Sequence, residues 1–237
     1  MMEFHGREIS LAELGAMAAT SEFAINIIKK EWVSSYEEFV ESVYDSIDKA
    51  FALLEKSPQS YFDDAIGEDK ITEELANMLV MAGFDARQGQ TQGGNVDLTV
   101  MGKKTTWSWI GEAKIFSTNT SLKEGLLQLT TRYRNASPLH AQAGILAYVK
   151  RANAVGCLQE WRTEVEGMVL PDLSLSECNR RGPLAFFTTH KHEATGLPIK
   201  IRHTAISLYH LPKDKSGRGA KKFAAAHSME AAEKPAK

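Results

Sequence analysis

The stretch NVDLTVM (residues 95–101), followed by WSWIGEAKIF (residues 107–116), decides the fold. Polar and apolar side chains alternate along both segments, which is typical of β-strands because successive side chains point to opposite faces of a sheet. Residues 102–104 (Gly-Lys-Lys) separate the two segments as a turn. The two strands are therefore expected to form a hairpin.

The expected hairpin gathers charged side chains on one face. Glu112 and Lys114 are two positions apart, so they share a face, while Asp97 reaches them if the hairpin has the right register. The opposite face of the second strand carries Trp107, Trp109, Ala113 and Ile115. Charges on such apolar strands are costly without partners, and two close carboxylates repel each other. We therefore expect a bound cation or a raised pKa at this position.

The order of elements predicts an α/β fold with a mixed central sheet flanked by helices. Further predicted helices cover residues 68–81, 121–133 and 153–166, and further strands cover residues 84–90, 143–149, 184–189 and 199–211. Residues 9–56 have a helical pattern, and Ser10 is a candidate cap for the first helix.

Three regions are expected along the chain: an N-terminal helical extension (1–57), the sheet domain (58–212) and a disordered tail (213–237). The apolar stripe between residues 32 and 54 predicts a helix packed against the rest of the protein. The alternative is an arm that makes a homodimer or binds a partner protein. The tail is rich in Lys, Gly, Ala and Glu, and its basic part is expected to be solvated, with contact to phosphates as the alternative.

Composition indicates an ordinary globular protein of 237 residues, with 43% hydrophobic and 24% charged residues. The net charge of -2 argues against a broadly basic surface for nucleic acid, although local clusters remain allowed. The two cysteines, Cys157 and Cys178, offer neither a zinc knuckle nor a disulfide framework. Because no apolar run approaches the roughly 20 residues of a membrane span, and no signal peptide is visible, a cytoplasmic protein without membrane contact is expected.

The order and spacing of the hairpin motifs resemble the PD-(D/E)XK nuclease superfamily. The residues that carry the resemblance are GGNVDLTV, with Asp97, and WIGEAKIF, with Glu112 and Lys114. The resemblance covers about residues 68–150, and it departs from the family name at Val96, where that name has a proline. It implies a restriction-endonuclease-like core and metal-dependent hydrolysis of phosphodiester bonds.

The resemblance also implies roles for individual residues. Asp97, Glu112 and the carbonyl of Ala113 would hold Mg²⁺ or Mn²⁺, the cations that oxygen ligands favour. Lys114 would orient the attacking water or stabilise developing negative charge. Members of the family often add a helix with a glutamine and an aromatic residue, and LLQLTTRY supplies Gln128 and Tyr133. Gln128 would then help to position water or the lysine.

Family members also place an acidic residue on the helix before the hairpin, and three candidates occur here. Glu68 shares one helical face with Ile71, Leu75 and Leu79, so it is expected to point along the packed side toward the sheet. Glu74 lies on the flank of that face and is the second choice, whereas Glu73 points away. The alternative for Glu68 is a residue that merely favours the start of a helix through the dipole.

The expected function is a DNA endonuclease, with a role in bacterial defence against foreign DNA suggested only by how such folds are often used. A dimer would suit cleavage of both strands of a duplex. Two alternatives stay open: a non-catalytic nucleic-acid- or protein-binding module that kept the fold, and a nuclease acting on RNA. A surface salt-bridge cluster is the structural alternative for the site. His190 and His192 are also candidate metal ligands, but a polar cluster beside a turn is favoured.

Overall fold

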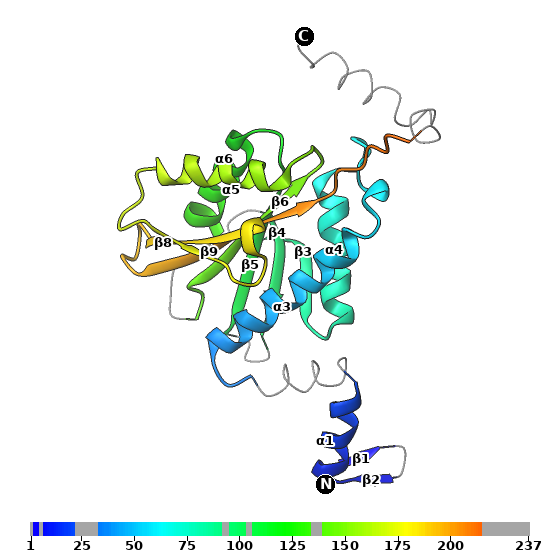
Figure 1. Ribbon diagram of the computed structural model, residues 1–237. Helices are drawn as coiled ribbons and strands as arrows, with labels where there is room; N and C mark the ends of the chain where they lie inside the picture. Colours follow the sequence, from blue (N-terminus) through cyan, green and yellow to red (C-terminus); the bar gives the residue numbers. More distant parts are fainter. Residues whose placement is uncertain are drawn as a thin grey trace.

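A seven-stranded mixed sheet flanked by helices forms the body of the protein (Figure 1). The computed structural model describes residues 2–4, 7–21, 33–91, 95–102, 106–133 and 139–214. The strand order is β3-β4-β5-β6-β9-β8-β7. The strands are β3 (Asp85–Thr91), β4 (Asn95–Met101), β5 (Ser108–Ile115), β6 (Gln142–Val149), β7 (Ser174–Glu177), β8 (Ala185–Lys191) and β9 (Pro198–Ser207).

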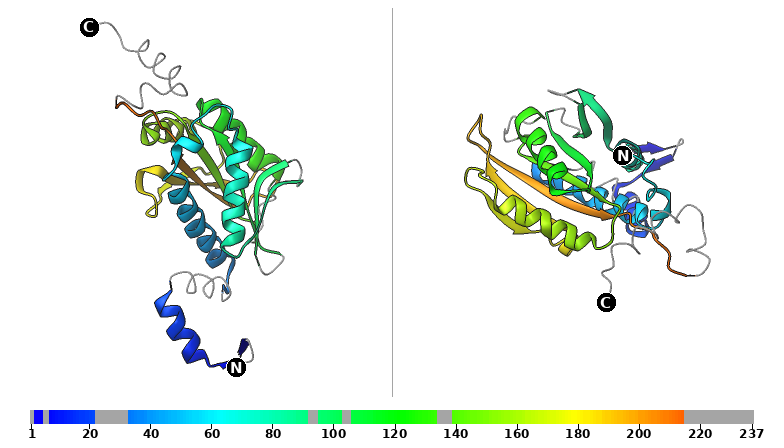
Figure 2. Two further views of the ribbon diagram at one scale, coloured as in Figure 1. Left: turned by 90° about the vertical axis from the view of Figure 1, so that its right-hand side faces the viewer. Right: turned by 90° about the horizontal axis from the view of Figure 1, so that it is seen from above.

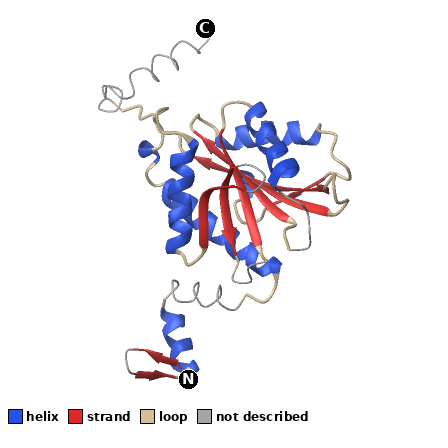
Figure 3. Cartoon of the chain, turned by 180° about the vertical axis from the view of Figure 1, so that it is seen from behind, coloured by secondary structure: helices blue, strands red, loops and turns tan. Residues whose placement is uncertain are grey.

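The strand directions confirm the predicted mixed sheet and its hairpin. β5, β6 and β9 are parallel, while β3, β4, β7 and β8 join the sheet through antiparallel pairs. In the hairpin, Val100 lies opposite Trp109, and Leu98 lies opposite Gly111. Figure 3 shows these strands from behind in red, with helices around them.

Helices cover both faces of the sheet (Figure 2). α3 (Tyr36–Leu54) and α4 (Glu68–Met81) share one apolar core with the sheet, whereas α5 (Asn119–Gln128) and α6 (Ala154–Glu166) share the other. Strand β5 separates these cores, because Trp109 and Ala113 enter the first and Ile110 enters the second. The predicted alternation of side chains along this strand is therefore confirmed.

Helix α3 belongs to the main core, although the sequence places it in an N-terminal extension. Its buried face includes Phe39, Val43, Tyr44 and Phe51, which pack with α4 and the sheet. This confirms the expected packing of the stripe against the rest of the protein. The expected boundary at residue 57 therefore falls just after a helix of the core, in a short connection that contains the 3-10 turn η1 (Pro58–Ser60).

The N-terminal segment differs from the expected helix at its start. β1 (Met2–Phe4) and β2 (Arg7–Ile9) form a two-stranded antiparallel sheet, and α1 (Leu11–Thr20) follows. Ser10 caps this helix as predicted: the amide of Glu13 donates to Ser10 Oγ at 3.2 Å, and the amide of Ser10 donates to Glu13 Oε2 at 3.0 Å. Residues 22–32 of the expected helical region lie outside the described residues.

Three smaller features go beyond the predictions. The predicted helix 121–133 ends as a π-helical segment, η2 (Leu129–Tyr133), and a 3-10 turn, η3 (Gly182–Leu184), precedes β8. β7 is not expected from the sequence, because it has only four residues and stays largely exposed. The predicted tail from residue 215 onward lies outside the described residues. Within the described ranges, no helix is long and apolar enough to cross a membrane.

Candidate functional site

The strands of the hairpin stop pairing just before Asp97, and two carboxylates take over their hydrogen bonds. Leu98 and Gly111 form the last pair of the β4–β5 register. Beyond it, the amide of Ala113 donates to Asp97 Oδ2 at 2.8 Å, and the amide of Ile115 donates to Glu68 Oε2 at 3.2 Å. An unpaired amide inside a protein is costly, so these bonds hold both carboxylates against the free edge of β5.

Lys114 lies at the point where the acidic side chains converge. Its Nζ is 2.7 Å from Glu112 Oε1, 3.3 Å from Glu68 Oε1 and 3.5 Å from Asp97 Oδ2. The three carboxylates come from α4, β4 and β5, so the sheet and one covering helix both contribute to the site. In the described part of the chain, no three His, Cys, Asp or Glu side chains form a metal-binding group by themselves. Here the ammonium of Lys114 holds the carboxylates together.

Burial excludes a surface salt-bridge cluster. The side chain of Glu112 is 2% exposed, and those of Lys114 and Asp97 are 18% and 19% exposed. Pairs on a protein surface lie in water and contribute little, whereas these charges are largely removed from it.

Glu112 is the most deeply buried acid of the group, and burial disfavours its charged form. Burial raises the pKa of its carboxyl to about 7; the hydrogen bond from Lys114 opposes this change, and the charge of Asp97 adds to it. Its Oε2 atom is buried, and it has no hydrogen-bond partner among the described residues. A buried oxygen without a donor is costly, and a cation would satisfy it.

Lys114 keeps its proton. Burial lowers the pKa of its ammonium, but the hydrogen bond to Glu112 and the charges of Asp97 and Glu68 outweigh burial and raise that pKa above its ordinary value. With all three acids ionised, the group retains an excess of negative charge. That excess favours a further positive charge close to the carboxylates.

The structure separates the three candidates for the helical acid. Glu68 contacts Lys114 and the amide of Ile115, as its place on the packed face of α4 predicts. Glu73 pairs with Lys70 at 2.8 Å on the exposed side of the helix. Glu74 lies beside Tyr61. Burial raises the pKa of the Tyr61 hydroxyl, and the hydrogen bond and charge of Glu74 raise it further. Only Glu68 of these three meets the hairpin.

Gln128 and Tyr133 are not brought into this group by the described contacts. Gln128 ends α5 half-buried, and within the described ranges it makes no hydrogen bond to Glu112 or Lys114. The side chain of Tyr133 lies outside the described part. Helix α5 instead approaches through Gly125, where an added Cβ would lie 3.1 Å from Glu112 Cγ and 3.4 Å from Lys114 Cγ.

The sequence analysis therefore missed Gly125. The sequence feature that could have indicated its close packing is its place inside a predicted helix, one turn before Gln128. A glycine inside a helix is unfavourable unless close packing requires it. It also missed Thr72 and Tyr148, whose side chains meet at 2.9 Å beside the start of α4. Thr72 follows Glu68 by one helical turn, so its position on the same face could have been read from the spacing.

The two histidines set aside from the sequence lie near the end of β8 and directly after it. His190 and His192 are buried, and His192 Nε2 lies 2.9 Å from the carbonyl oxygen of Thr130. Burial lowers the pKa of His190, and the neighbouring His192 lowers it further. The described residues around them supply no third ligand of the kind that a metal needs. The favoured interpretation as a polar cluster agrees with these contacts.

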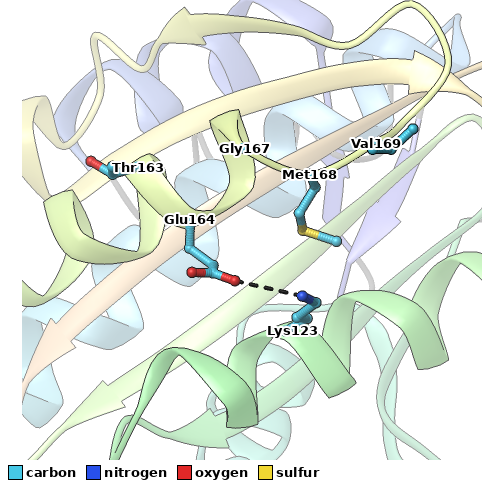
Figure 4. Close-up of a pocket in the computed structure, with 6 residues that line it drawn as sticks. All are labelled: Lys123, Thr163, Glu164, Gly167, Met168 and Val169. Atoms are coloured by element: carbon cyan, nitrogen blue, oxygen red, sulfur yellow. Dashed lines mark ion pairs between the residues drawn. The ribbon is translucent and has the colours of Figure 1, made fainter.

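A separate cavity of about 370 Å³ lies between α5 and α6 (Figure 4). Lys123 and Glu164 face each other across it at 3.6 Å, and Met168 points into the same space. None of the residues that line this cavity belongs to the carboxylate group. The candidate site is therefore the place where the hairpin strands part, and not this cavity.

Comparison of the chain with family models, with curated proteins and with solved structures gave no match. The chemistry of the site therefore rests on its own atoms. Those atoms are carboxylate oxygens around one ammonium, at the edge of a strand whose amides they satisfy.

Proposed function

We propose that the chain is a divalent-metal-dependent nuclease that hydrolyses phosphodiester bonds, acting as a DNA endonuclease on a restriction-endonuclease-like core. One observation carries the proposal: carboxylates from α4, β4 and β5 converge on the Lys114 ammonium, and one buried oxygen of Glu112 stays without a partner. Structural ion pairs rarely leave a buried carboxylate oxygen unsatisfied, whereas a metal site requires oxygens that remain able to bind.

The donor set fits a hard divalent cation. Glu68, Asp97, Glu112 and the carbonyl of Ala113 would supply oxygen ligands only, which suits Mg²⁺ or Mn²⁺ and disfavours zinc. When bound, such an ion would neutralise phosphate charge and make a water molecule more acidic. The negative excess of the acidic group and the unsatisfied oxygen of Glu112 both support this fit.

The protein's own residues would perform the remaining tasks. Lys114 stays protonated, so it can donate hydrogen bonds to a phosphate oxygen and stabilise the charge that develops there in the transition state. Asp97 and Glu68 keep the edge of β5 in place through the amides of Ala113 and Ile115. Gln128 enters the proposal, as a residue that positions water or the lysine, only through the family resemblance.

Partners and pathway belong to the same proposal. Because α3 places its apolar face in the core, a homodimer contact or a partner protein would use the segment before it, which includes α1. A role in bacterial defence against foreign DNA, in the cytoplasm, extends the proposal by analogy. The alternative is a non-catalytic nucleic-acid- or protein-binding module that kept the fold, which the net charge of -2 allows.

Cleavage assays with Asp97→Asn would test the proposed function. We expect the wild type to cleave DNA with Mg²⁺ or Mn²⁺ and not with a chelator, and the variant to lose about a hundredfold or more of that activity. Residues that only support a metal ligand already change affinity or activity by about 10–100-fold. Asparagine keeps an acceptor for the amide of Ala113, so the fold should persist.

Asp85→Asn is the matched control, because this exposed carboxylate lies on the neighbouring strand β3 and pairs with Arg87. It should leave cleavage unchanged. Parallel assays with single-stranded DNA and with RNA would separate the substrate classes. Cleavage that is equal in the wild type and Asp97→Asn would contradict the proposal. Calorimetry that shows no Asp97-dependent binding of Mg²⁺ would favour the non-catalytic module.

A further inference from the structure

The start of α4, which carries Glu68, is held from the neighbouring strand β6. Tyr148 lies near the end of β6, and Lys150 follows directly after it. Both side chains bind the segment 63–72, which leads into α4 and forms its first turn. Glu68 is the one acid of the site that does not come from the hairpin, so its place depends on this helix.

The first anchor is a buried chain of hydrogen bonds. Thr72 Oγ1 donates to the carbonyl of Glu68 at 2.8 Å, and Thr72 Oγ1 and Tyr148 Oη are 2.9 Å apart. A threonine hydroxyl has a single hydrogen, so Tyr148 must be the donor in the second bond. Burial raises the pKa of Tyr148 well above its usual range, the bond to Thr72 opposes this, and the charges of Asp97 and Glu68 add to it. Tyr148 therefore remains a donor.

The second anchor binds the loop before the helix. Lys150 Nζ donates to the carbonyl of Ile66 at 2.6 Å and to the carbonyl of Asp63 at 2.8 Å. The N-cap of α4 is Gly67, which has no side chain to satisfy the free amides of the first turn. Local capping therefore does little to hold this end of the helix, and contacts from β6 gain importance.

Glu68 makes a longer bond to the backbone of β5 than Asp97 does. Its side chain is 34% exposed, and its contacts with Lys114 Nζ and with the amide of Ile115 are 3.3 and 3.2 Å long. These bonds are longer than the usual charge-assisted bond of about 2.7–2.9 Å. The position of the Glu68 carboxylate is therefore determined mainly by helix α4, and its own contacts contribute less to holding that helix.

We propose that Tyr148 and Lys150 are positioning residues that set the place of Glu68 and thereby the affinity of the site for a divalent cation. This inference rests on the proposed function, since it assigns Glu68 to the cation. Tyr148 acts through Thr72 and the backbone of Glu68, and Lys150 acts through the loop at residues 63–66. Neither touches the cation, the phosphate or the reacting atoms.

Calorimetric titration of Mg²⁺ into the intact protein, without nucleic acid, tests the inference. We expect Tyr148→Phe and Thr72→Val each to weaken Mg²⁺ binding by about tenfold, as changes just outside a metal's ligands often do. Thr72→Ser keeps the hydroxyl and should keep wild-type affinity. Lys150→Met keeps the length of the side chain and removes its ammonium, and it should also weaken binding.

A second background distinguishes positioning from a general loss of stability. In Glu68→Gln, adding Tyr148→Phe should cause no further loss of affinity, because the residue to be positioned is already altered. Tyr36→Phe is the matched control. The buried hydroxyl of Tyr36 makes hydrogen bonds to the backbone at Ser108 and Gln142, the first residues of β5 and β6, whereas Lys114 and Tyr148 lie near the last residues of these strands. It should lower stability and leave Mg²⁺ affinity unchanged.

The outcomes separate the two proposals. If the wild type binds Mg²⁺ in an Asp97-dependent manner but Tyr148→Phe and Lys150→Met bind it equally well, the positioning role is overturned and the proposed function stands. A loss in Tyr148→Phe that persists undiminished in Glu68→Gln also overturns that role. If Asp97→Asn leaves the titration of the wild type unchanged, both proposals fail.

Discussion

Replacing Glu112 with glutamine is expected to abolish metal-dependent cleavage and to stabilise the protein when no divalent cation is present. Glutamine removes the charge that a cation would bind, so we expect activity to fall by about a thousandfold, the upper end of the effect of one electrostatic group at an active site. The same charge is buried beside Asp97, with one oxygen unpartnered. Removing this charge therefore removes the cost of burying it and stabilises the folded state.

The gain in stability should depend on pH in a defined direction. Burial raises the pKa of Glu112 from 4.5 in the unfolded chain to about 7 in the folded protein. The folded state therefore prefers the protonated acid, and this contribution is complete below pH 4.5 and is lost as the pH rises through 7. The full difference corresponds to about 3 kcal/mol. Glu112→Gln should match the wild type near pH 4.5 and exceed its stability at pH 8.

The comparison with the variant is needed because a buried histidine acts in the opposite direction. Burial lowers the pKa of His203 to about 3, and Trp161 Nε1 donates to its Nδ1 at 3.0 Å, which requires a neutral ring. The unfolded chain binds this proton below about pH 6.5, so His203 makes the protein more stable as the pH rises. Both proteins share this contribution, and it cancels in their difference.

Chemical unfolding of wild type and Glu112→Gln, at several pH values in a chelator and again in Mg²⁺, would measure these effects. Mg²⁺ should stabilise the wild type and leave the variant nearly unchanged. Glu41→Gln is a suitable control, because this carboxylate pairs with Arg180 on the surface. A variant that is less stable than the wild type at pH 8 would show that Glu112 serves the structure and not a cation.

Local pattern was enough to predict the hairpin and the residues that share its faces. Alternation along β5 places Glu112 and Lys114 together, and it places Ala113 in the opposite core, because the period of a strand is fixed at two. The helical period likewise selected Glu68 over Glu73. Both inferences use geometry within one element, which short-range sequence spacing determines.

Contacts between elements could not be predicted in the same way. The amide of Ile115 is available to Glu68 because the β4–β5 pairing ends at Leu98. No sequence pattern in the hairpin indicates where that pairing ends. Tyr148 meets Thr72 across 76 positions of the chain. Gln128 was placed by resemblance to a family and not by any contact, and the structure instead puts Gly125 of that helix against Glu112 and Lys114.

Short or exposed elements were also missed for a physical reason. β7 has four residues and β1 and β2 have three each, which is too few for a period of two to stand out from chance. The stripe of α3 predicted burial correctly, but it contained no information about which surface the helix would cover. That surface proved to be the sheet itself.

Replacing Lys114 with methionine is expected to abolish cleavage while preserving or strengthening the binding of Mg²⁺. The ammonium is within 3.5 Å of all three carboxylates, so a cation must compete with it for their oxygens. Methionine fills a similar volume without charge and removes this competitor. It also removes the donor that would stabilise the phosphate in the transition state, and we expect activity to fall by about a hundredfold or more.

Stability should change in the direction opposite to that of Glu112→Gln. Without its ammonium, the site holds three acids close together, and breaking one side of a buried ion pair costs about 3 kcal/mol. Mg²⁺ at a hundred times its dissociation constant would return about 2.7 kcal/mol. Thermal unfolding with and without Mg²⁺, together with calorimetry, would measure both effects, and Lys70→Met on the exposed face of α4 provides the control.

The pair of variants then distinguishes a cation centre from a structural ion-pair cluster. In a cation centre, loss of the acid removes binding and stabilises the chain, whereas loss of the lysine preserves binding and destabilises it. In a structural cluster, Glu112 and Lys114 support each other at 2.7 Å, so both variants should lower stability, and Mg²⁺ should restore neither. Opposite signs in metal-free unfolding, together with Mg²⁺ binding that is lost in Glu112→Gln and kept in Lys114→Met, are therefore the combined result that a cation centre predicts and a structural cluster does not.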